Sequence, residues 1–264
     1  MRRMSLVLAS CAVFASAVVR TEPVTVQRTE GLVHGFLSLS SLDGTRLASG
    51  DLIQFARGPL VTSRLVFHFI DGSLHDETVD FRQAKQFEFV KDHLVQRGPS
   101  FPQPIDMMID GATRTATVRY TNGHGNAKTD SVQFDLPADL ANGVLMTLLK
   151  NVKPTALPKT LSFIAATPKP QLVKLALSTL GEDPFSTAGV TRKAVHYQLK
   201  VEVGGLKGLV APLVGKQPPD LHFWILPGDA PAFVKSEQQL YFGGPIWRIE
   251  LASPVWPKGA RAFN

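Results

Sequence analysis

The feature that most constrains the fold is a two-residue alternation of apolar and polar side chains. The clearest case is HYQLKVEV at residues 196–203, where every second residue is apolar. Similar runs occur at residues 61–69, 86–90, 115–120, 132–136 and 173–177. Asp-Gly or Asn-Gly pairs, which accept the positive φ of tight hairpin turns, stand between alternating runs at residues 43–44, 71–72, 110–111 and 122–123. The pattern predicts an antiparallel meander with one buried face and one wet face.

One segment has a different period. Within residues 137–151 the apolar residues stand at 140, 144, 145, 148 and 149, which is the spacing of an amphipathic helix. Pro137 suits a first helical turn and Asn151 suits a helix end, although Gly143 weakens the helix. We therefore expect a mostly β protein, a curved antiparallel sheet or open barrel, with one short helix near 137–151 covering a face or a mouth.

The N-terminus has the features of an export signal. Arg2 and Arg3 precede an apolar run from Met4 to Phe14, and the small residues of 15–17 follow. This predicts a signal peptide over 1–17, an N-terminal extension over 18–30 and a single β-rich domain over 31–264. The apolar run is too short for a membrane span, so we expect a periplasmic or secreted protein without an integral membrane span in the mature chain.

Cys11 is the single cysteine of the chain. Leu8-Ala9-Ser10-Cys11 resembles a bacterial lipobox, which makes a lipoprotein anchored at Cys11 the alternative to simple export. Only about six apolar residues precede Cys11, which is short for the apolar part of a signal. If the cysteine leaves with the signal peptide, no disulfide can form and the domain must be held together by burial of its core.

Charge and motifs exclude several functions. The net charge is +6, but its 28 basic residues are spread along the chain, so no nucleic-acid partner is expected. Gly208 to Gly215-Lys216 looks like a phosphate loop, yet six residues separate the glycines and Gln217 follows the lysine, which breaks the pattern. Gly-x-Ser-x-Gly and His-Glu-x-x-His are absent. We therefore expect no cofactor and name no catalytic residue.

The Asp71-Gly72 turn offers one metal hypothesis. A two-residue turn would pair His68 with His75, and Glu77 would lie on the same face. His68, His75 and Glu77 would then be candidate ligands of a metal-dependent extracytoplasmic enzyme. A change of one residue in the register would move every side chain of one strand to the other face and destroy this triad.

The last quarter of the chain carries the candidate ligand pocket. All three tryptophans are there, and residues 221–226 are apolar on both faces, as in a core strand or a strand that faces an apolar cavity. Asp220 and His222 share a face, which we interpret as structural. An apolar cavity above about 300 Å³ under the helix would favour a carrier. The pocket candidates are His222, Phe223, Trp224, Tyr241, Trp247 and Met146.

The layout as a whole, an exported, cysteine-poor antiparallel meander with one helix, resembles the periplasmic lipoprotein carriers of the Lol type and related exported bacterial proteins. The resemblance implies a half-barrel that binds a lipid or acyl group under its concave face, without catalysis. We thus expect a non-enzymatic envelope protein whose partner is an apolar small molecule, a lipid or another envelope protein. The alternatives are the metal-dependent enzyme and a structural or partner-binding β domain that presents a sheet edge.

Overall fold

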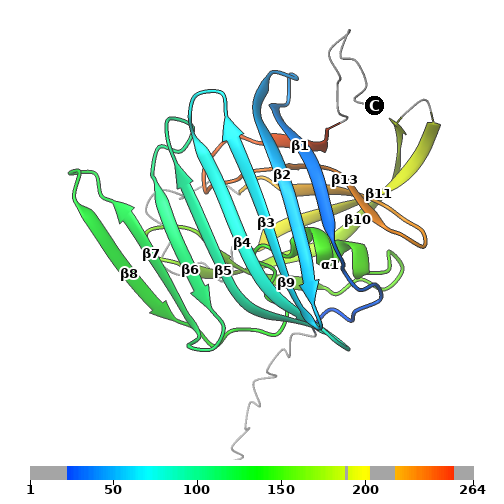
Figure 1. Ribbon diagram of the computed structural model, residues 1–264, viewed down its shortest axis with the longest axis horizontal. Helices are drawn as coiled ribbons and strands as arrows, with labels where there is room; N and C mark the ends of the chain where they lie inside the picture. Colours follow the sequence, from blue (N-terminus) through cyan, green and yellow to red (C-terminus); the bar gives the residue numbers. More distant parts are fainter. Residues whose placement is uncertain (1–22, 188–189, 203–217, 253–264) are drawn as a thin grey trace, which may run out of the picture.

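The computed structural model describes residues 23–187, 190–202 and 218–252. Within them, fourteen strands form one antiparallel sheet that curves around a short helix (Figure 1). The strands are β1 (Val33–Ser41), β2 (Arg46–Arg57), β3 (Leu60–Phe69), β4 (Leu74–Gln83), β5 (Phe87–Arg97), β6 (Ile105–Asp110), β7 (Thr115–Thr121), β8 (Ala127–Gln133), β9 (Thr160–Ala165), β10 (Gln171–Thr187), β11 (Val190–Glu202), β12 (Leu221–Leu226), β13 (Ala232–Gln238) and β14 (Trp247–Leu251). The predicted fold class is confirmed. The signal peptide, Cys11 and the Gly208–Lys216 loop lie outside the described residues.

The sheet consists of two meanders joined through the first and last strands. β1 to β8 follow one another along one half, β9 to β14 along the other, and β14 pairs with β1. In that central pairing Leu39 faces Ile249, and both side chains are buried. β8 and β9 are the two ends of the strand order and do not pair, so the sheet is curved but not closed.

The edge of β9 is covered by the segment that precedes the helix. Leu140 forms a parallel bridge to Ser162, and the Asn142 side chain exchanges two hydrogen bonds with the backbone of Ile164, at 2.9 and 2.8 Å. Leu140 and Ile164 then pack against the buried apolar residues of β5, β6 and β7. Side-chain packing therefore closes the side of the barrel that strand pairing leaves open.

The helix, α1 (Leu145–Asn151), is shorter than the expected 137–151. Residues 139–142 run beside β9, and Gly143 then takes a positive φ of 65°, which a helix does not contain. From Leu145 onward the chain is helical and buries its apolar residues, as their spacing predicts. Leu148 and Leu149 are almost fully buried in the main core, between the two halves of the sheet.

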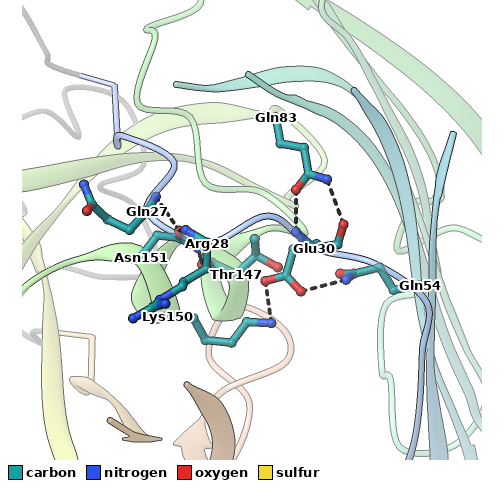
Figure 2. Close-up of polar contacts among 8 residues, drawn as sticks. All are labelled: Gln27, Arg28, Glu30, Gln54, Gln83, Thr147, Lys150 and Asn151. Atoms are coloured by element: carbon teal, nitrogen blue, oxygen red, sulfur yellow. Dashed lines mark hydrogen bonds and ion pairs between the residues drawn. The ribbon is translucent and has the colours of Figure 1, made fainter. Parts of the chain in front are cut away.

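The N-terminal residues 23–30, part of the expected extension 18–30, are tied to α1 (Figure 2). The Asn151 carboxamide oxygen accepts hydrogen bonds from the backbone N–H groups of Gln27 and Arg28, at 2.9 and 2.7 Å. Val24 is buried in the main core. This segment therefore packs as part of the domain.

Glu30 connects the same segment to the sheet (Figure 2). Its carboxylate pairs with Lys150 of α1 and accepts a 2.8 Å hydrogen bond from Gln54 of β2. Its backbone exchanges two hydrogen bonds with the Gln83 side chain of β4. These contacts fix the orientation of α1 inside the curve. None of the helices among the described residues has the length and apolar character needed to cross a membrane.

Candidate ligand-binding site

A cavity of about 200 Å³ lies between α1 and the concave face of the sheet. Its wall is mostly apolar and comes from both halves of the sheet, from α1 and from the loop 238–242. The volume is smaller than the ~300 Å³ above which the cavity was expected to favour a carrier. The cavity therefore suits a small ligand or the inserted part of a longer one.

Three of the six predicted pocket residues meet in this cavity. Phe223 points inward from β12, Met146 comes from α1, and Tyr241 comes from the loop after β13. Trp247 lies behind them, buried, with its ring centroid 6.0 Å from that of Tyr241. Trp247 thus supports the cavity wall from the core and does not line it.

His222 and Trp224 lie on the other face of β12, away from this cavity. Trp224 stacks on His196 with the ring centroids 4.1 Å apart, and its Nε1–H donates a 2.7 Å hydrogen bond to Asp183. The Lys235 ammonium lies 3.9 Å from the Trp224 ring centroid, a cation–π contact. Trp224 belongs to the wall of a broader groove of about 1410 Å³ between the end of the β10–β11 hairpin and the outer face of β1 and β2.

The predicted metal triad is not formed. The pairing of His68 with His75 is wrong, because Phe67 pairs with His75 and His68 pairs with Leu74. The turn has three residues: the Phe69 N–H donates to the Ser73 carbonyl at 3.0 Å. His68 is therefore exposed on the outer face, opposite His75 and Glu77. Among the described residues there is no group of three or more His, Cys, Asp or Glu that could hold a metal ion.

The correct register places a polar group on the inner face of β4 and β5. His75 pairs with Gln96. Glu77 pairs with Leu94, and Val79 pairs with Asp92. His75 and Glu77 line the cavity, and Asp92 is fully buried beside them, against Gly143. Asp92 and Gln96 were not among the predicted site residues, because their only signal in the sequence is that they alternate in step with the apolar Leu94.

These buried polar groups are incompletely hydrogen-bonded. The Gln96 Nε2 donates to His75 Nδ1 at 3.0 Å and to the Leu240 carbonyl at 2.6 Å. His75 Nε2, Gln96 Oε1 and both carboxyl oxygens of Asp92 have no partner among the described residues. Buried polar atoms are normally paired with protein, water or ligand. His75, which lines the cavity, and Gln96, which is hydrogen-bonded to it, therefore give the otherwise apolar cavity one polar end.

Burial sets the charge of this wall. Burial raises the pKa of Glu77 to about 7. It also raises the pKa of Asp92 well above its usual range, and the neighbouring Glu77 charge adds to the effect. Burial lowers the pKa of His75 to about 4, against the opposing effect of Asp76. Near neutral pH, His75 is therefore uncharged and Glu77 is close to half ionised, while burial favours the protonated form of Asp92.

Comparison with known proteins finds similarity at the level of structure only. The chain matches no family model and no curated protein. It is similar in structure to the hypothetical lipoprotein YmcC from Escherichia coli (K12), with a TM-score of 0.38 and 9% identity over 86% of this chain and 87% of the other. It is also similar to a β-barrel-like protein of the domain of unknown function DUF1849 from Brucella abortus, with a TM-score of 0.45 and 9% identity over 87% of this chain and 100% of the other.

Proposed function

We propose that the protein is a non-enzymatic binding protein of the cell envelope that holds an apolar, lipid-like ligand inside its curved sheet. The observation that carries the proposal is the cavity between α1 and the sheet, walled by Phe223, Met146 and other apolar side chains. Filling such a space with apolar ligand surface contributes roughly 25 cal/mol per Å² removed from water. The predicted signal peptide supports a periplasmic or secreted location, and lipidation at Cys11 remains the alternative.

A neutral apolar fluorophore, N-phenyl-1-naphthylamine, provides a direct test. Its fluorescence is expected to rise on addition of the purified mature protein, and long-chain amphiphiles are expected to displace it. Ala165 lines the cavity, so Ala165→Phe should fill the space and weaken binding of the fluorophore. Ala127 lies exposed on β8, and Ala127→Phe is the matched control that should bind as the wild type does.

Two results would contradict the proposal. One is the absence of fluorophore binding by a folded wild-type protein. The other is equal binding by the wild type and Ala165→Phe, which would place the fluorophore elsewhere, for example in the outer groove beside Trp224. Native mass spectrometry of the protein from its own host would report signal cleavage, lipidation at Cys11 and any co-purified lipid in a single measurement.

A further inference from the structure

Glu77 is a half-buried carboxyl group that lies between apolar residues of the neighbouring strands. Across the sheet it pairs with Leu65 of β3 on one side and with Leu94 of β5 on the other. It makes no hydrogen bond or ion pair with any residue that the structure describes. None of the described residues that line the cavity is a lysine or an arginine. Among the described residues of the wall, the charge of Glu77 therefore has no compensating cation.

The unpaired atoms near Glu77 are mainly acceptors. His75 Nδ1 accepts the Gln96 amide hydrogen, so the single proton of the neutral ring is on Nε2. His75 Nε2 is thus one unpaired donor and Gln96 Oε1 one unpaired acceptor. The ionised Glu77 carboxylate, which also lines the cavity, offers acceptor oxygens only. A ligand that satisfies this wall must bring hydrogen-bond donors and, to compensate Glu77, a positive charge.

We infer that the polar end of the ligand is a primary ammonium that pairs with the Glu77 carboxylate while the apolar part occupies the cavity. An ammonium group has three donors and no acceptor, which matches the surplus of acceptor atoms. A carboxylate head would meet the charge of Glu77 and a single donor, His75 Nε2. The inference rests on the proposed function and specifies which amphiphile the same cavity takes.

Asp92 has a different role from Glu77. It is completely buried, and its Oδ1 would lie 3.1 Å from a Cβ placed on Gly143. The loop before α1 therefore covers Asp92, and the cavity wall includes Glu77 but not Asp92. A protonated Asp92 contributes no charge to the ligand. Replacing it by the uncharged, similarly shaped asparagine thus provides a control for the loss of a buried carboxyl group.

The experiment compares three amphiphiles that differ only in the head group. Dodecylamine, dodecanol and dodecanoate are titrated against the protein loaded with N-phenyl-1-naphthylamine, at about pH 8, where Glu77 is ionised. Wild-type protein is expected to release the fluorophore at an amine concentration about tenfold lower than that of the other two, a ratio typical of one compensated charge. Glu77→Gln should remove this preference, and Asp92→Asn and the exposed-site variant Glu182→Gln should retain it.

A pH series on the wild type tests the same pairing without a substitution. The preference for dodecylamine over dodecanol, which does not titrate, should fall about tenfold between about pH 8 and about pH 5.5, because Glu77 becomes protonated. His75 and Tyr241 are the other titratable residues of the described cavity wall. His75 remains neutral over this range because burial lowers its pKa to about 4. This pH series tests whether Glu77 pairs with the ammonium even if Glu77→Gln does not fold.

The outcomes separate the two proposals. If the fluorophore does not bind the wild type, the proposed function fails and the inference fails with it. If the fluorophore binds but dodecanoate displaces it as well as dodecylamine does, only the inference is overturned. Equal displacement by dodecanol and dodecylamine would show that the site accepts an uncharged head group, which also overturns the inference of an ammonium. An amine preference that survives Glu77→Gln would exclude Glu77 as its partner.

Discussion

The carboxyl group of Glu77 should make the unliganded protein less stable as the pH rises. Its pKa is about 7 in the folded protein, against 4.5 for an exposed glutamate. Between these values the folded state binds a proton that the unfolded state has lost, so the free energy of unfolding decreases with increasing pH. The stabilising contribution is complete below about pH 4.5 and is lost through about pH 7.

The magnitude follows from the two pKa values. The difference between 4.5 and about 7 corresponds to about 3 kcal/mol of differential stability. His75 acts in the opposite direction, because its pKa is about 4 when folded against 6.5 when exposed. Its contribution rises with pH over most of the same interval and masks that of Glu77 in the wild type. The informative quantity is therefore the difference between Glu77→Gln and the wild type, in which the His75 contribution cancels.

Urea denaturation followed by tryptophan fluorescence measures this difference. Relative to the wild type, the free energy of unfolding of Glu77→Gln should rise by about 3 kcal/mol between about pH 4.5 and about pH 8. Glu182→Gln, at an exposed site, should differ from the wild type by less than about 0.5 kcal/mol throughout. A Glu77→Gln difference that changes by less than about 1 kcal/mol over the interval would refute the idea that folding raises the pKa of Glu77 to about 7.

Three further substitutions, measured by urea denaturation, test the contacts that hold the loop before α1 and the outer face of β12 in place. Gly143→Ala should lower the free energy of unfolding by at least about 2 kcal/mol, because φ is 65° and the new Cβ would lie 2.7 Å from a buried valine. Its control, Gly125→Ala, has a φ of 77° but no atom near the new Cβ, and should lower the free energy of unfolding by about 1 kcal/mol. Asn142→Ala should cost about 2–3 kcal/mol, because it leaves both backbone groups of Ile164 unpaired. Trp224→Phe should cost about 1 kcal/mol through one lost hydrogen bond and should leave fluorophore binding unchanged.

The alternation of apolar and polar residues was sufficient to predict the sheet. The run at 196–203 falls almost entirely in β11, and the run at 61–69 falls in β3. Local alternation works here because each strand buries one face, and this burial does not depend on which strand is the neighbour. It could not predict that β14 would pair with β1, since that contact joins opposite ends of the chain.

The turn at Asp71-Gly72 shows where local sequence rules fail. Its position was predicted correctly, but its length decides which side chains face inward. The Asp71 carboxylate accepts hydrogen bonds from the Ser73 N–H, at 2.9 Å, and from the Ser100 hydroxyl, at 2.7 Å. The second bond comes from a residue after β5, so the three-residue loop depends on a tertiary contact. That contact puts His68 outside and removes the metal hypothesis.

The start of α1 was misplaced for a related reason. The spacing at 140, 144 and 145 fits a helix, and nothing local opposes it except Gly143. In the folded chain the backbone of residues 139–142 instead forms hydrogen bonds with the unpaired backbone groups at the edge of β9. That strand lies about twenty residues later in the sequence. An exposed strand edge is costly, and covering it outweighs one additional helical turn.

The polar group on the inner face of β4 and β5 could not be found from the sequence because polar residues at alternating positions normally belong to the wet face of a strand. His75, Glu77, Asp92 and Gln96 follow this pattern, and only the strand order and the curvature show that their face is the inside. A local rule broken without compensation is expected mainly where function requires it. The chain retains the Glu77 carboxyl group, whose raised pKa lowers the stability of the folded protein near neutral pH, although an apolar residue at this position would extend the core. The proposed ammonium ligand would supply donors and a positive charge to this wall, and its binding would offset that loss of stability.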